Sequence, residues 1–171
     1  TATAVTRGDL SAARSYHAAT SNINFGYFGG GSVGPNFSSV DRLDYSNDTT
    51  NASPRGPLSA ARGYLGATGS ASFGYFGGGT SPTVSTIDRI DYFTDTATAS
   101  PKGPLSAARY YASATGNADF GYFGGGSLGP SSSRISTVDR IDYSNDTGTT
   151  PTKGPLSAAK KYLIATGNSF F

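Results

Sequence analysis

The chain of 171 residues contains no cysteine, methionine or tryptophan, and it also lacks glutamate and glutamine, since all 11 acidic residues are aspartate. Without cysteine there can be no disulfide, thiolate metal ligand or cysteine nucleophile. Glutamate, glutamine and methionine are strong helix formers, whereas the glycine, threonine, tyrosine and phenylalanine that abound here favour turns and strands. These absences predict an all-β protein.

Long apolar runs and blocks of charge are missing as well. No run approaches the roughly 20 residues of a membrane-spanning helix, which predicts a soluble protein without a membrane partner. The 13 basic and 11 acidic residues, a formal net charge of +2, recur at fixed places instead of forming a basic stripe, so we expect no nucleic-acid partner. We find no signal peptide and no initiator methionine, and expect a processed product or part of a longer protein.

What the chain has instead is an internal repeat. Leu-Ser-Ala-Ala-Arg begins at residues 10, 58 and 105, and a fourth copy at 156 ends in lysine, so successive copies are 48, 47 and 51 residues apart. Gly-Tyr-Phe-Gly-Gly-Gly occurs at 26–31, 74–79 and 121–126, and Asp-Arg-Leu/Ile-Asp-Tyr ends at residues 45, 92 and 143. The chain consists of little besides this unit.

Each unit is expected to form four short strands separated by turn residues. In the third unit we place them at 110–115, 119–124, 137–143 and about 147–152. Alternation along the third of these strands puts charged and apolar side chains on both faces. Such mixing suits a sheet with neighbouring sheets on both sides better than a sheet with one face in water.

Four strands in a period of about 40–50 residues are typical of a β-propeller blade. The unit resembles a kelch repeat in the double glycine after an aromatic strand (75–78), in the arginine that opens the first strand (Arg62, Arg109) and in the Asp-Tyr pair that ends the third (91–92). It departs from that family where kelch repeats carry a tryptophan, since 96–100 contains only threonine, alanine and serine. The resemblance implies an all-β propeller in which phenylalanine and tyrosine of the second strands pack between blades.

The amino-acid sequence of the repeat, above all at 139–147, also resembles repeat arrays in large structural proteins of marine cyanobacterial phages. That resemblance implies a virion-associated protein of a tail or fibre. We expect the repeated aspartates to pair with the neighbouring arginines Arg42, Arg89 and Arg140. The residues to which we assign structural roles are Arg14, Arg62, Arg109, Tyr27, Phe28, Tyr75, Phe76, Tyr122, Phe123, Asp41, Arg42, Asp88, Arg89, Asp139 and Arg140.

The repeat divides the chain into three complete blades and two partial ones. The predicted units are a terminal outer strand and turn at 1–13, blades at 14–61, 62–108 and 109–159, and the first strands of a partial blade at 160–171. In the first of these, 1–6 is the expected fourth strand. A four-bladed ring with a defective seam, a ring completed by a second chain, and a fragment of a longer array all fit this division. We favour the last two, and so expect further copies of the chain, or the rest of a longer array, as partners.

No catalytic or metal site emerges from the sequence. The single histidine, His17, stands where other units have leucine or alanine, and paired aspartates such as Asp41 and Asp44 recur in every unit, which a catalytic pair would not. The oxygens at 44–48 and 142–146 are spaced as in a calcium loop, but Asx turns explain them. The Arg-Gly-Asp at 7–9 is the repeat's own turn. We therefore expect no cofactor, no metal and no enzyme activity.

The units differ mainly in the segment between the second and third strands, and binding commonly resides in loops on a rigid scaffold. Neutral drift in solvent is the alternative explanation. The binding residues predicted on this varied loop face are Val33, Pro35, Asn36, Phe37, Ser81, Pro82, Thr83, Leu128, Pro130, Ser132 and Arg134. The sequence thus predicts a virion-associated or extracellular structural and binding module that attaches to a host-surface glycan or protein. A secreted or cell-surface adhesin or lectin, and part of a propeller enzyme, are the alternatives.

Overall fold

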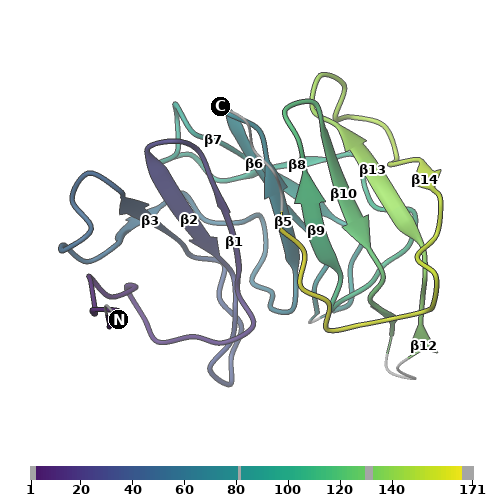
Figure 1. Ribbon diagram of the computed structural model, residues 1–171, viewed down its shortest axis with the longest axis horizontal. Coiled ribbons are helices and arrows are strands. Elements are labelled where there is room, and N and C mark those ends of the chain that lie inside the picture. Colours follow the sequence, from purple (N-terminus) through teal and green to yellow (C-terminus); the bar gives the residue numbers. More distant parts are fainter. Residues whose placement is uncertain (1–2, 81, 130–132, 167–171) are drawn as a thin grey trace.

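The computed structural model describes residues 3–80, 82–129 and 133–166, and in these residues all regular structure is β-strand. Three four-stranded antiparallel sheets follow one another along the chain and lie side by side (Figure 1). No helix in the described part of the chain could cross a membrane. The all-β prediction is confirmed.

Each sheet is a simple meander of consecutive strands. The first sheet holds β1 (Ala18–Ser21), β2 (Phe25–Gly29), β3 (Val40–Asp44) and β4 (Ser53–Arg55). The middle sheet holds β5 (Gly66–Gly69), β6 (Phe73–Gly77), β7 (Ile87–Asp91) and β8 (Ser100–Lys102). The third sheet holds β9 (Ser113–Gly116), β10 (Phe120–Gly124), β13 (Val138–Asp142) and β14 (Thr152–Lys153), and β11 (Ser127–Leu128) pairs with β12 (Ser133–Arg134) as a separate hairpin.

The sheets contact one another through their first strands, because β5 lies against β1 on one side and β9 on the other (Figure 1). Equivalent residues keep the same register in each sheet: Tyr27 is opposite Arg42, and Tyr75 is opposite Arg89. The repeat in sequence is therefore a repeat of whole sheets, each ending in a short outer strand.

Two of the expected strand positions are wrong. The fourth strand of the third unit is at 152–153 and not at about 147–152, and in the first partial unit residues 3–6 form no strand, while 1–2 lie outside the described residues. The fourth strands are short and end at the basic residue before Gly-Pro, and in β4 and β8 a proline lies inside the strand. An edge strand tolerates proline because one of its two sides needs no N–H donor.

The first strand also begins later than expected, at Ser113 and not at residue 110. The strand starts later because Tyr111 has a φ of 57°, in the left-handed region, and an extended strand cannot pass through that backbone conformation. The equivalent tyrosines of the other units are in the same conformation.

The hydrophobic core lies between the sheets. One cluster joins the first and middle sheets, and a second joins the middle and third sheets. Tyr27, Tyr75, Phe76 and Phe123 of the second strands are fully buried in these clusters. Burial of this kind is the main source of stability in a protein of this size, so each sheet depends on its neighbour.

A buried ion pair secures the entry to each sheet, and its partners differ from those expected. The carboxylate of Asp88 in β7 pairs with Arg62 at 3.0 Å and accepts hydrogen bonds from the backbone N–H and the hydroxyl of Ser59 at 2.8 Å. Asp41 pairs with Arg14, and Asp139 pairs with Arg109. The expected pairing of these aspartates with the adjacent arginines in sequence is wrong, because adjacent strand residues point to opposite faces.

Candidate binding surface

The varied loops and the entries to the first strands lie at the same end of the sheets. In a meander, the end of the second strand and the start of the first are neighbours, and the bridges Ser15↔Ser32, Gly63↔Thr80 and Tyr110↔Ser127 join the two segments in each unit. This end of the molecule therefore combines loops that vary with segments that repeat.

Four tyrosines form a continuous row at this end. The ring centroids of Tyr16 and Tyr64 are 4.1 Å apart, those of Tyr64 and Tyr111 4.6 Å, and those of Tyr111 and Tyr162 4.1 Å. The row crosses all three sheets and continues into the segment after the third. We call these four residues the tyrosine row.

All four tyrosines are in the left-handed backbone region, with φ between 57° and 62°. A bulky residue other than glycine seldom adopts this conformation, which costs about 1–3 kcal/mol, so the surrounding structure must impose it. Hydrogen bonds link the row between neighbouring units: the backbone N–H of Tyr64 donates to the carbonyl of Tyr16 at 2.8 Å, and that of Tyr111 donates to Tyr64 at 2.9 Å. The same unfavourable conformation therefore recurs in register in four copies of the repeat.

The row offers aromatic surface and hydroxyl groups to solvent. Tyr16 and Tyr162 at its two ends are 52% and 63% exposed. The ammonium of Lys161 lies 5.0 Å from the centroid of the Tyr162 ring, within the range of a cation–π contact. Burial, reinforced by hydrogen bonding with Tyr162 and Tyr64, raises the pKa of Tyr111, so its hydroxyl stays protonated and able to donate. This combination suits a polar ligand with an apolar face.

A cavity of about 150 Å³ is lined by the four tyrosines of the row and by the residues that follow them, His17, Leu65, Ala112 and Leu163. Burial, together with the charge of Arg14, lowers the pKa of His17, which is therefore neutral at physiological pH. Its Nδ1 is buried without a hydrogen-bond partner among the described residues. The first unit thus has a neutral imidazole where the other units have leucine or alanine.

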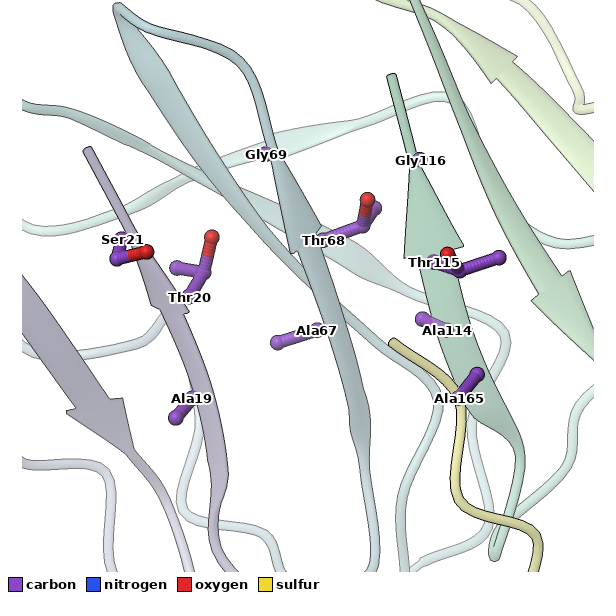
Figure 2. Close-up of a pocket in the computed structure, with 10 residues that line it drawn as sticks. All are labelled: Ala19, Thr20, Ser21, Ala67, Thr68, Gly69, Ala114, Thr115, Gly116 and Ala165. Carbon is purple, nitrogen blue, oxygen red and sulfur yellow. The ribbon is translucent and has the colours of Figure 1, made fainter. Parts of the chain in front are cut away.

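A second cavity of about 180 Å³ lies between the first strands of the three sheets (Figure 2). Its lining consists of small side chains and backbone from β1, β5 and β9, together with Ala165. The hydroxyls of Thr20 and Thr68 on this surface are already engaged with Tyr92 and Tyr143, at 3.0 and 2.8 Å. The accessible lining of the cavity is mainly polar, and no titratable side chain lines it.

The predicted loop residues divide into exposed and structural ones. Val33 is 62% exposed, and Pro35, Pro82 and Arg134 are exposed as well. Thr83 and Leu128 are half-buried. Ser81, Pro130 and Ser132 lie outside the described residues.

Asn36 and Phe37 of the first loop face the protein. The side-chain amide of Asn36 donates to the carbonyl of Thr80 in the next unit at 3.0 Å, and the Phe37 ring lies 5.2 Å from the guanidinium of Arg14. Asn36 thus links the first unit to the second, and the Phe37 ring packs within its own unit.

The candidate calcium loops are closed by their own hydrogen bonds. Oδ1 of Asp44 accepts from the backbone N–H and the hydroxyl of Ser46, at 2.9 and 2.7 Å, and these bonds lower its pKa. Asp142 and Ser144 repeat the arrangement. In the described part of the chain, no group of three or more histidine, cysteine, aspartate or glutamate residues could hold a metal ion.

The tyrosine row was missed by the sequence analysis, although a signal for it was present. Each tyrosine stands two residues after the basic residue that ends Leu-Ser-Ala-Ala-Arg/Lys, in all four copies. A tyrosine so close to a strand entry is easily taken for a strand residue, and its left-handed backbone is invisible in the sequence.

No known protein-family model matches this sequence, and a search of curated proteins found no relative of it.

Proposed function

We propose that the three sheets are consecutive blades of a β-propeller of kelch-like repeats. The meander within each sheet, the close approach of β1, β5 and β9, and the cores between sheets support this proposal (Figure 1). In a propeller, the first strands of the blades line a central channel. The cavity between those three strands fits the position of such a channel (Figure 2).

On this basis, the protein serves as a non-enzymatic structural and binding module, in a virion tail or fibre or on a cell surface. The observation that carries the proposal is the tyrosine row, whose unfavourable backbone conformation recurs four times at the end from which the varied loops emerge. The proposed partner is a host-surface glycan or protein that contacts the row and the exposed loop residues.

The arrangement of the acids supports a non-enzymatic role. Asp41, Asp88 and Asp139 are fully buried, and each is held by a serine and an arginine. A carboxylate that is bound in this way cannot readily accept a proton from a substrate, since its oxygens already accept hydrogen bonds. The enzyme alternative would need an acid pair free of such partners.

The experiment is a binding assay on a glycan array and on host-cell surface proteins, with Tyr16→Gly/Tyr162→Gly compared with the unaltered chain. Glycine adopts the left-handed conformation without strain, so this variant removes the two exposed rings while keeping the backbone. We expect binding to fall by about 10-fold or more, as for aromatic residues at the centre of an interface.

The control is Phe93→Ala, which removes an 84% exposed ring from the turn between β7 and β8, at the opposite end of the sheets. Its binding should equal that of the unaltered chain. Equal binding by the double glycine variant would show that the tyrosine row is not the recognition surface.

A further inference from the structure

The junction between the first and middle sheets consists of a small set of specific contacts. The ring of Tyr27 stacks on that of Tyr92 at 4.6 Å, and its hydroxyl donates to Asp95 at 3.0 Å. Arg42 donates to the same carboxylate oxygen at 2.8 Å. The hydroxyls of Tyr92 and Thr20 are hydrogen-bonded at 3.0 Å. One acid of the following sheet thus satisfies two donors of the preceding one.

The junction between the middle and third sheets repeats these contacts residue for residue. Tyr75 stacks on Tyr143 at 4.9 Å and donates to Asp146 at 3.0 Å, and Arg89 donates to Asp146 at 2.8 Å. Thr68 and Tyr143 are hydrogen-bonded at 2.8 Å. The set is therefore a standard joint between consecutive units.

A glycine completes each joint. A Cβ on Gly29 would lie 2.7 Å from the ring of Phe76, and one on Gly77 would lie 2.6 Å from the ring of Phe123. Only glycine lets the phenylalanine of the following sheet press against the second strand of the preceding one. The joint therefore has an aromatic, an ionic and a steric part.

The outer face of the third sheet presents the preceding half of this joint without the tyrosine and aspartate of a following sheet, and the segment 155–166 covers part of it. Tyr122 is only half-buried, and its hydroxyl has no hydrogen-bond partner among the described residues. Arg140 lies 4.2 Å over the ring of Phe120, as Arg42 lies over Phe25, but it makes no ion pair with a described acid. The nearest atom to a Cβ on Gly124 would be 3.7 Å away.

The outer face of the first sheet presents the residues that a following sheet contributes to the joint. Asp48 corresponds to Asp95 and Asp146, and its side chain is 45% exposed, with only Arg7 beside it at 3.4 Å. Tyr45 corresponds to Tyr92 and Tyr143 and is 48% exposed. Phe28, the equivalent of the fully buried Phe76 and Phe123, is half-buried.

We propose that these two faces dock head to tail, so that the third sheet of one chain binds the first sheet of a second copy. Asp48 of the second copy receives the hydroxyl of Tyr122 and the guanidinium of Arg140, Tyr45 stacks on Tyr122, and Phe28 packs against Gly124. The charges of Asp48 and Arg140 are opposite, and the side chains that would meet are of the same types as those in the two internal joints. This inference rests on the proposed assembly role and names its partner.

Docking requires the C-terminal segment 155–166 to leave the third sheet. The backbone N–H of Leu156 donates to Ser136 at 2.8 Å, that of Lys160 donates to Ile135 at 3.1 Å, and the hydroxyl of Thr115 donates to Thr166 at 2.7 Å. These contacts occupy the place that the equivalent segment 9–20 of the second copy takes when its first sheet docks. Tyr45 of the second copy then replaces Thr166 at the hydroxyl of Thr115, as Tyr92 and Tyr143 bind Thr20 and Thr68.

The test is sedimentation equilibrium of the purified chain, whose monomer has a mass of 17.4 kDa. We expect the unaltered chain to associate, and the single charge reversals Asp48→Arg and Arg140→Asp to weaken association about 10- to 100-fold, as for close interfacial charge pairs. The double variant restores the pair with reversed sign and should recover most of the affinity. Failure of the double variant to recover would contradict the ionic part of the joint.

A second variant separates docking from folding. In Gly124→Ala the added methyl has room within one chain but meets Phe28 of the docked copy, so its thermal unfolding should match that of the unaltered chain under monomeric conditions while association is lost. Asp91→Ala, which removes an acid from the middle sheet, is the control and should associate normally. An unaltered chain that stays monomeric, or a Gly124→Ala variant that associates as tightly, would overturn the proposal. Glycan or cell-surface binding by monomeric Gly124→Ala tests the proposed function independently.

Discussion

At the scale of single residues, the protein depends on buried arginines and aspartates that form ion pairs with one another. Arg62 donates to Asp88, and also to the backbone carbonyls of Gly78 and Phe76, at 2.9 and 3.2 Å. A buried ion pair stabilises little by comparison with apolar side chains of the same size, but removing one member leaves the other buried without a counter-ion. The repeated Ser-x-x-Arg clamp on an aspartate therefore fixes where the chain enters each sheet.

We expect Asp88→Asn to destabilise the protein by about 3–5 kcal/mol, because the guanidinium of Arg62 would stay buried without its carboxylate. Urea unfolding followed by tyrosine fluorescence measures the change. Asp119→Asn is the matched control, since Asp119 is exposed, and its effect should stay within about 0.5 kcal/mol. Equal effects of the two substitutions would mean that the clamp is not needed for stability.

At the scale of elements, glycine and proline mark where a strand meets its neighbours. Pro54 and Pro101 lie in the outer strands β4 and β8, where a missing N–H is tolerated. Gly29 and Gly77 end second strands at the point where a phenylalanine of the next sheet arrives. The same sequence position in β10, Gly124, has open space. Identical residues thus have different packing roles, depending on whether a sheet follows.

We expect Gly77→Ala to lower the free energy of unfolding by about 1–3 kcal/mol, because its methyl group would overlap the ring of Phe123. Gly124→Ala at the equivalent position should be close to neutral in the monomer. Chemical denaturation of the two variants at low protein concentration makes the comparison. Similar losses at both positions would contradict the packing described for the middle and third sheets.

At the scale of the whole molecule, stability is shared between neighbours. The middle sheet contributes to both hydrophobic clusters, whereas the first and third sheets each contribute to one. In a linear array of repeated units, each unit is stabilised mainly by its interfaces with adjacent units. The two outer sheets therefore lack half of the interactions that hold the middle one.

We expect native-state amide exchange to be slowest in the middle sheet, above all in β6 and β7, and faster in the equivalent strands β2, β3, β10 and β13. Local opening free energies follow the number of buried interfaces, so protection should differ by about 10-fold or more. Hydrogen-exchange mass spectrometry on the isolated monomer measures this, with Gly124→Ala keeping the chain monomeric. Uniform protection across the sheets would show a single cooperative unit.

The sequence by itself determined the fold class, the repeat and four strands in each unit. These follow from local chemistry: helix formers are absent, and turn residues return at a period of 47–51 residues. The sequence did not show which residues far apart along the chain are in contact. Asp41 pairs with Arg14 and not with Arg42, because alternation turns neighbours on a strand to opposite faces and the partner comes from 27 residues away.

The tyrosine row and the two complementary outer faces were decided by the tertiary structure. Tyr64 has a left-handed backbone and donates its backbone N–H to Tyr16 of the unit before it, and no local preference of tyrosine predicts that conformation. Gly77 and Gly124 are the same residue in the same motif, yet one is packed and the other open, because only the first has a following sheet against it. Contacts between units depend on which unit lies against which in the folded chain, and the sequence of a single unit does not specify them.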